Sequence, residues 1–111
     1  MRVVYIVGPY RSGTIRTIVE NIRRAEAVAL RYWRKGYAVI CPHKNSELFD
    51  GAVSDEVILR GDIEFLKRSD QVVVLPGWER SEGSVGEVAV ARELGIPIIY
   101  EELEVLEENV A

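Results

Sequence analysis

Glu87 and Asp62 are the two carboxylates whose surroundings best suit chemistry on a small ligand. Glu87 ends the glycine-bearing segment GSVGE at residues 83–87, and Asp62 follows Gly61. Cleavage of a glycosidic bond needs two such groups, because one attacks or stabilises the cationic sugar carbon while the other handles the leaving group's proton. If a helix begins near Ser84, Glu87 lies in its first turn, where the helix dipole favours an ionised carboxylate. The alternative interpretation of Glu87 is an ordinary acid at a helix start.

The loop before Glu87 has the composition of a ligand-binding loop. Gly83 leaves room for a ligand against the backbone, and Ser84 with the free amides of a helix start suits an anion. In the alternative interpretation the glycines only shape a turn. Gly77 and Trp78 precede this segment, and Trp78 is either a stacking wall for a planar base or a packing or oligomer contact.

A second unusual loop follows the first apolar run of the chain. Tyr5 lies near the end of that run, and Gly8, Tyr10, Arg11 and Ser12 follow. Arg11, Ser12 and helix-start amides suit a phosphate or a hydroxyl group. The loop is neither a Walker loop nor a GxGxxG fingerprint, so nothing predicts ATP. Tyr10 is equally compatible with a partly exposed aromatic that packs on a neighbour.

Three further residues favour structural roles. We expect His43 to be solvated or to tether a loop, rather than to act in catalysis. Asp70 directly precedes a strand and suits capping or turn formation. Cys41 is expected to be a small buried hydrophobe.

The elements that position these residues follow from apolar periodicity and from glycine and proline punctuation. A Thr17…Glu20 capping box and Gly36 are expected to bound the first helix. The expected strands are residues 3–7, 37–41, 71–75 and 97–100, and the expected helices are residues 15–33, 55–68 and 84–94. About a dozen polar or turn-prone residues follow the second strand, and loops of this length are usually functional or mobile.

Strand alternating with helix predicts a three-layer α/β fold, Rossmann-like or flavodoxin-like, with a parallel sheet in the order 2-1-3-4 and helices on both faces. The acidic segment 101–111 leaves room for a short fifth strand. In this order the chain changes direction between strands 1 and 3, and ligands bind outside the carboxyl ends of the strands at such a point. The loops at residues 8–14 and 76–87 meet there.

Composition excludes several classes of protein. The 111 residues fit one domain covering 1–111, with 48% hydrophobic and 29% charged residues. A single cysteine and a single histidine are too few to form a typical zinc site. No metal or cofactor is expected. No run reaches the length of a membrane span and no signal peptide is visible, which predicts a cytoplasmic protein with no membrane partner. Residues 1–44 are basic, but the sequence has no basic stripe with interleaved aromatic residues. We therefore expect no nucleic-acid polymer as a partner.

The segments VYIVGPYR and GDIEFLKRSDQVVVLPGWERSEGSVGEVAVARELGIPI together resemble the nucleoside 2-deoxyribosyltransferase-like superfamily. The chain looks closest to a small branch with a GW-x-x-S-x-G-x-x-x-E loop, related to 2′-deoxynucleoside 5′-phosphate N-hydrolases. The resemblance implies that Glu87 is the nucleophile, that Asp62 handles the base's proton and that Tyr5 orients Glu87. It also implies that Ser84, with Arg11 and Ser12, contacts the 5′ end of the sugar.

Ser81 departs from the transferase pattern, in which an aspartate commonly stands six residues before the glutamate. The resemblance further implies a nucleoside or nucleotide ligand and a homodimer or larger homo-oligomer, with Tyr32, Trp33 and Trp78 as interface anchors or core residues. We therefore expect N-glycosidic cleavage or transfer through a glycosyl-Glu87 intermediate. The alternatives are a non-catalytic nucleotide-binding or sensing module and a phosphoribohydrolase-type enzyme, whose usual paired glycines and threonine are absent.

Overall fold

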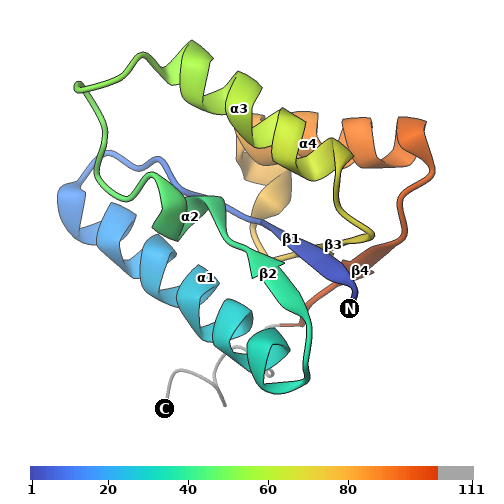
Figure 1. Cartoon of the computed structure of the whole chain (residues 1–111). Helices are drawn as coiled ribbons and strands as arrows, with labels where there is room; N and C mark the ends of the chain where they lie inside the picture. The colour runs from blue at the N-terminus through green and yellow to red at the C-terminus, as the bar shows by residue number, and fades with distance from the viewer. Residues whose placement is uncertain (103–111) are drawn as a thin grey trace.

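The computed structural model describes residues 1–102, which form one parallel sheet with helices on both faces (Figure 1). Its strand order is β2-β1-β3-β4, which confirms the expected order and fold class. The elements are β1 (Val3–Val7), α1 (Ile15–Arg34), β2 (Ala38–Ile40), α2 (Pro42–Asn45), α3 (Asp55–Lys67), β3 (Gln71–Val74), the 3-10 turn η1 (Trp78–Arg80), α4 (Glu82–Leu94) and β4 (Ile98–Tyr100).

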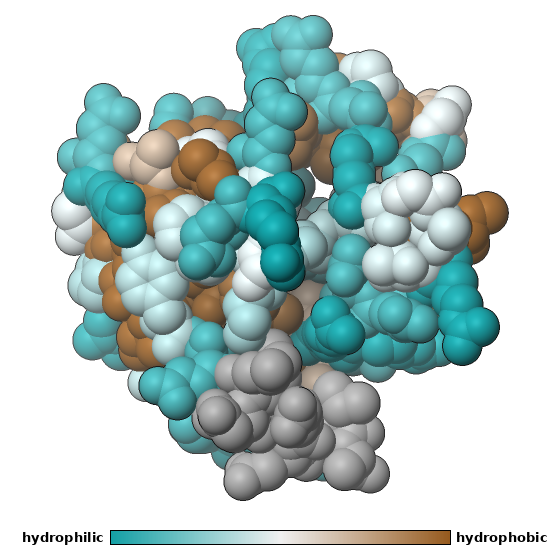
Figure 2. All heavy atoms as spheres, turned by 180° about the vertical axis from the view of Figure 1, so that it is seen from behind, coloured by the Kyte–Doolittle hydropathy of each residue, from teal (hydrophilic) through white to brown (hydrophobic). Residues whose placement is uncertain are grey.

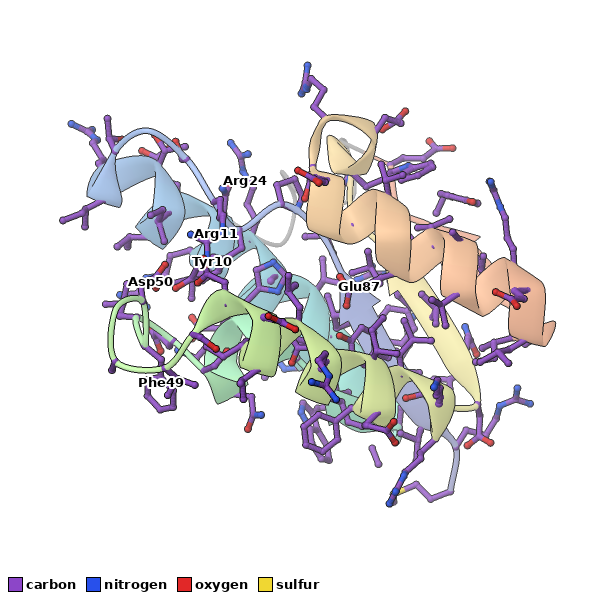
Figure 3. The ribbon with its side chains drawn as sticks, turned by 90° about the horizontal axis from the view of Figure 1, so that it is seen from above. Tyr10, Arg11, Arg24, Phe49, Asp50 and Glu87 are labelled. Atoms are coloured by element: carbon purple, nitrogen blue, oxygen red, sulfur yellow. The ribbon has the colours of Figure 1, made fainter. Side chains whose placement is uncertain are left out.

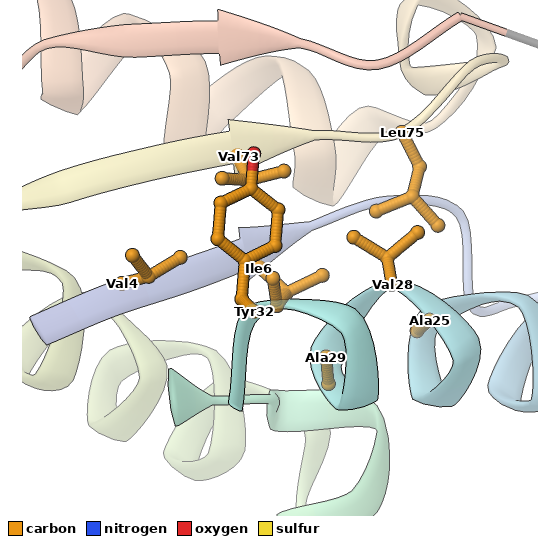
Figure 4. Packing of buried hydrophobic residues seen from close by; sticks show 8 residues of the cluster. All are labelled: Val4, Ile6, Ala25, Val28, Ala29, Tyr32, Val73 and Leu75. Atoms are coloured by element: carbon orange, nitrogen blue, oxygen red, sulfur yellow. The ribbon is translucent and has the colours of Figure 1, made fainter. Parts of the chain in front are cut away.

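The two central strands are apolar on both faces, because helices cover both. Alternate residues of β1 and β3 therefore belong to different clusters. On one face the cluster is built on α1 (Figure 4), and its members are Val4, Ile6, Ala25, Val28, Ala29, Tyr32, Val73 and Leu75. On the other face it is built on α3 and α4, and its members are Tyr5, Val7, Leu66, Val72, Val74, Val88 and Ala91. The side chain of Tyr5 consequently lies on the face covered by α4.

Helix α1 begins without the expected capping box. Thr14 is its N-cap, and its side chain accepts a hydrogen bond from the Thr17 backbone amide at 3.2 Å. Thr17 is thus inside the first turn and does not cap the helix. Gly36, with φ of 91°, follows the end of the helix as expected, in a backbone conformation that favours glycine.

The long segment after β2 contains the short helix α2, which sequence periodicity did not reveal. His43 in this helix is buried, and its Nε2 lies 3.1 Å from the carbonyl oxygen of Gly8 and 3.0 Å from that of Pro9. The histidine therefore ties α2 to the loop after β1, in agreement with the tethering role. Asp70 has a structural role of a different kind from the expected capping or turn formation: its carboxylate accepts a hydrogen bond from the Val3 amide at 2.7 Å and so ties the start of β3 to the start of β1.

Two expectations concern the ends and the surface of the molecule. The short fifth strand would fall beyond residue 102 and lies outside the described residues. Among residues 1–102, none of the helices combines the length and the apolar character needed to cross a membrane. On the side opposite to Figure 1, hydrophilic side chains dominate the surface outside the grey residues, and apolar atoms show between them (Figure 2).

Candidate active site

Glu87 and Tyr5 are joined directly. The Tyr5 hydroxyl donates a short hydrogen bond to Oε2 of Glu87. Tyr5 is fully buried in β1, and burial together with the neighbouring Glu87 carboxylate raises the pKa of the Tyr5 hydroxyl far above its usual value. The hydroxyl therefore keeps its proton and acts as a fixed donor to Glu87.

Glu87 lies deeper in α4 than the sequence suggested. The N-cap of α4 is Ser81, whose side chain accepts a hydrogen bond from the Ser84 amide at 3.3 Å, so Glu87 is in the second turn. The expectation that a first-turn dipole keeps Glu87 ionised is therefore wrong. Burial raises the pKa of Glu87 to about 7, while the hydrogen bond from Tyr5 opposes that rise.

Asp62 approaches the same space from α3. Partial burial raises the pKa of its carboxyl group to about 6, and its charge contributes to the raised pKa of Glu87. Both carboxyl groups therefore titrate near neutral pH, unlike ordinary surface acids. Their arrangement, from two helices over one sheet face, gives the paired carboxylates that the sequence predicted.

Both carboxylates line a cavity of about 1070 Å³ on the side of the sheet where the strands end. Its size is at the upper end of small-molecule pockets. The wall includes Gly8, Tyr10, Arg11, Asp62, Gly77, Ser81, Gly83, Ser84 and Glu87 among the residues expected at the site. Three others lie elsewhere: Tyr5 is buried beneath Glu87, Ser12 is exposed outside the wall, and Trp78 packs against the α4-side cluster with its ring centroid 5.8 Å from that of Tyr100.

The start of α4 presents one unusual polar atom. The hydroxyl oxygen of Ser84 is buried, and it has no hydrogen-bond partner among residues 1–102. A buried hydroxyl without a partner is unfavourable unless a ligand or water satisfies it. Ser84 belongs to the cavity wall, and so do the neighbouring glycines Gly83 and Gly86.

Arg11 is paired with two acidic residues, Asp50 in the segment between α2 and α3 and Asp55 at the start of α3. Its guanidinium lies 3.7 Å from Asp50 and forms a closer ion pair with Asp55. The hydroxyl of Tyr10 donates to Asp50 at 2.6 Å and accepts from the Leu48 amide at 3.1 Å. Figure 3 shows Tyr10, Arg11 and Asp50 close together near the start of α1. These contacts fasten two loops to each other across one end of the cavity.

Two other arginines of the wall were missed by the sequence analysis. Arg24 of α1 and Arg80 of η1 line the cavity, and neither forms an ion pair with another residue of the described part of the chain. Arg24 follows Thr17 and Asn21 at helical spacing, and all three line the cavity. This polar stripe beside the apolar face of α1 was the available signal.

No group of three or more metal-ligating side chains occurs within residues 1–102. The arrangement offers two carboxyl groups, a fixed tyrosine donor and cationic side chains at the carboxyl edge of a parallel sheet. The strand order and the position of the site define an α/β protein of flavodoxin-like topology.

Residues 2–100 match the family described as a domain of unknown function, DUF4406, and the chain belongs to that family. No curated protein matches the sequence. Among solved structures, the 2-deoxyribosyltransferase from the psychrotolerant bacterium Bacillus psychrosaccharolyticus is similar, with a TM-score of 0.63 and 18% sequence identity. The alignment covers 97% of this chain and 82% of that chain. At this identity the similarity shows a shared fold.

Proposed function

We propose that this chain cleaves the N-glycosidic bond of a nucleoside or nucleoside 5′-monophosphate through a covalent glycosyl intermediate on Glu87. The observation that carries the proposal is the placement of Glu87 and Asp62 on one cavity wall, with Tyr5 hydrogen-bonded to Glu87. The shared fold with a 2-deoxyribosyltransferase supports the same class of reaction. One fold hosts many activities, and the two carboxyl groups on the cavity wall are what favours this one.

The reaction has two steps. In the first, an ionised oxygen of Glu87 attacks the anomeric carbon, the bond from that carbon to the base nitrogen breaks, and its electron pair stays on the nitrogen. Asp62, as the carboxylic acid, donates its proton to the departing base. In the second step, water or another base attacks the anomeric carbon and breaks its bond to Glu87. Asp62, now a carboxylate, accepts the proton of the attacking group.

Tyr5 has a positioning role in this scheme. It holds one oxygen of Glu87, and its raised pKa keeps the hydroxyl protonated throughout the reaction. Its hydrogen bond also favours the ionised form of Glu87, which is the nucleophilic form. Burial alone would leave Glu87 protonated to a higher pH.

Arg24 and Arg80 support a phosphorylated substrate. Arg11 is already paired with Asp50 and Asp55, whereas these two guanidinium groups line the cavity without an ion pair to the described residues. A 5′-phosphate would give them a charge-assisted partner. We therefore shift the main phosphate contact from Arg11 and Ser12 to Arg24 and Arg80, together with the unpartnered hydroxyl of Ser84.

The test is a chromatographic screen of purified protein against deoxynucleosides, ribonucleosides and their 5′-monophosphates, with and without a second free base. The Glu87→Gln variant is measured in parallel. The matched control is Glu93→Gln, which changes an exposed acid of the same helix outside the cavity wall. Release of free base by wild type and by Glu93→Gln, but not by Glu87→Gln, is the expected result.

Absence of base release from every substrate, together with a thermal shift on adding a nucleotide, would refute the enzymatic proposal. That result would select the second candidate, a nucleotide-binding module without catalysis. The arginine side chains on the wall favour nucleotide binding in either case. Base release that persists in Glu87→Gln would instead remove the nucleophile assignment.

A further inference from the structure

The segment between α2 and α3 meets the loop after β1 at one end of the candidate active-site cavity. We define this segment, residues 46–54, as the strap. Asp50 of the strap lines the cavity, and so do Tyr10 and Arg11 of the loop. Asp50 contacts both of these residues, so the strap and the loop are joined across that end. Figure 3 shows Asp50 turned toward Tyr10 and Arg11, while the ring of Phe49 points away from them.

The strap has no apolar anchor. None of its residues is buried, and residues 48–54 are all exposed. Its large apolar side chains, Leu48, Phe49 and Val53, are 52%, 48% and 39% exposed. The strap folds on itself, because the carbonyl oxygen of Phe49 accepts hydrogen bonds from the amides of Ala52 and Val53 at 2.9 and 3.3 Å. It is therefore a compact turn that side-chain burial does not hold in place.

Polar contacts to Tyr10 and Arg11 attach the strap instead, and we call these contacts the fasteners. The Tyr10 hydroxyl holds two points of the strap, since it donates to Asp50 at 2.6 Å and accepts from the Leu48 amide at 3.1 Å. Arg11 adds ion pairs to Asp50 and to Asp55, the first residue of α3. The charged groups are open to solvent, with 62% of the Arg11 side chain exposed. Exposed ion pairs stabilise a structure only weakly, so the fasteners can break and form again.

The backbone of Leu48 favours movement of the strap once it is released. Its φ of 57° lies in the left-handed region, which a leucine rarely adopts. No other non-glycine residue of the described chain has a positive φ. The amide of Leu48 is the one that the Tyr10 hydroxyl holds. Loss of that hydrogen bond lets Leu48 return to an ordinary conformation, so the strain favours the unfastened form.

The two ends of the strap are held more firmly than its middle. Before the strap, the buried side chain of His43 ties α2 to the carbonyl oxygens of Gly8 and Pro9. At the other end, Ser54 is the N-cap of α3, and its side chain accepts a hydrogen bond from the Val57 amide at 3.3 Å. Neither of these contacts involves the fasteners. The strap can therefore change position between two fixed ends while the sheet and its helices stay folded.

We propose that the strap is a gate to the candidate active site, closed when the fasteners are formed and open when they break. In the closed form, the strap and the loop after β1 make one wall at this end of the cavity. In the open form, a planar ligand enters or leaves between them. The gate rests on the proposed function only for the identity of that ligand. Its opening is a property of the free protein and is measured without a nucleotide.

The first experiment measures access to the cavity by thiol labelling. Cys41 is the only cysteine, so a Cys41→Ala background carries no other thiol. In that background, Ile63→Cys places a thiol on the cavity wall, and Val57→Cys places one at an exposed position of the same helix outside the wall. The reagent is N-phenylmaleimide, which is neutral and planar. Tyr10→Phe removes both hydrogen bonds of the Tyr10 hydroxyl, so we expect it to speed labelling of Ile63→Cys about tenfold and to leave that of Val57→Cys unchanged.

The second experiment removes the ion pairs. Asp50→Asn and Asp55→Asn are each expected to speed labelling of Ile63→Cys. The matched control is Glu56→Gln, which changes an exposed acid of the first turn of α3 outside the cavity wall and is expected to have no effect. High salt screens exposed charges, so it should speed labelling when both aspartates are present and have less effect when both are replaced. Circular dichroism checks that each variant is folded.

The outcomes separate the gate from the proposed reaction. Labelling of Ile63→Cys that is unchanged by Tyr10→Phe and by the aspartate variants would overturn the gate, and so would an increase that Val57→Cys shares. Nucleotide binding is measured separately on Glu87→Gln by calorimetry. A protein whose labelling responds to the fasteners but which neither binds a nucleotide nor releases a base would keep the gate and lose the proposed function. Base release without any response to the fasteners would do the reverse.

Discussion

The hydroxyl of Tyr5 donates a hydrogen bond to the carboxylate of Glu87, although the two residues lie 82 positions apart in the chain. The contact joins the central strand β1 to helix α4, on the face of the sheet that α3 and α4 cover. It couples the orientation of Glu87 to a strand whose residues 4–7 are fully buried. The protonation of Glu87 is coupled to the same contact, because Tyr5 lowers a pKa that burial raises.

Tyr5→Phe tests this coupling. Removal of the hydroxyl deletes a hydrogen bond to a charged group, worth roughly 1.5–3 kcal/mol, so we expect a loss of about 10- to 100-fold in kcat. The pKa of Glu87 rises further above that of Asp62, so the maximum of the pH profile of kcat falls and its alkaline limb shifts to higher pH. The control is Tyr32→Phe, whose hydroxyl donates to Glu101 away from the cavity. An unshifted limb in Tyr5→Phe would contradict the positioning role.

The pH profile of base release should be bell-shaped. The reaction needs Glu87 ionised and Asp62 protonated, and the pKa values of Asp62 and Glu87 are raised to about 6 and about 7. Because Glu87 has the higher pKa, the reactive form is the less populated of the two singly protonated forms, and both forms are most abundant between the two values. Below this range both groups are protonated and the nucleophile is lost; above it both are ionised and the proton donor is lost. The expected maximum of kcat/KM lies between these two values. A rate that keeps rising to high pH would argue against Asp62 as the proton donor.

Glu87 should make the folded state less stable at high pH. Its folded-state pKa is about 7 against an ordinary value of 4.5, so its ionisation opposes folding progressively as the pH rises between those values. We expect Glu87→Gln to raise the free energy of unfolding at pH 8 by about 3 kcal/mol and to have little effect below pH 4.5. Urea denaturation at the two pH values measures the difference. Glu93→Gln should show no such pH-dependent gain, and equal gains in both variants would disprove the assignment.

Arg24→Ala and Arg80→Ala should weaken binding of phosphorylated substrates selectively. Each change removes a cation that would form a charge-assisted hydrogen bond, so KM for a nucleoside 5′-monophosphate should rise about tenfold while KM for the nucleoside stays nearly constant. Arg23→Ala is the control, since Arg23 is a neighbouring exposed arginine outside the cavity wall. A larger effect from Arg11→Ala than from both of these variants would return the phosphate contact to Arg11.

The strands were predictable because each is a short apolar run bounded by glycine or proline. Their alternation with helices then favoured a parallel sheet in the order 2-1-3-4. Residues 3–7 and 72–75 are apolar without alternation, which is typical of strands covered on both faces. The position of Glu87 followed from topology, since the loops after β1 and β3 meet at one edge of the sheet. Asp62 was expected near it because the helix that carries Asp62 runs from the same edge.

Other features of the site depend on three-dimensional contacts that the spacing of residues along the chain does not reveal. The start of α4 at Glu82, rather than at Ser84, moves Glu87 by half a turn and changes its electrostatic surroundings from a helix end to a buried interior. Arg11 looked free in the sequence, but Asp50 and Asp55 reach it from a segment some forty residues away. Helix periodicity likewise predicted α3 without indicating how little of it the chain would cover.

The central position of β1 fixes the order in which the molecule can assemble. β1 is synthesised first and pairs with β2 across one helix, whereas its second neighbour begins at Gln71, which pairs with Val4. The βαβ unit closes a short loop, and the β1–β3 pairing closes a much longer one, so the second half of the sheet costs more chain entropy to form. Glu87 comes later still. During translation, the two ends of the Tyr5–Glu87 contact can meet only after most of the described chain has left the ribosome, so this contact is among the later ones that the folding chain forms.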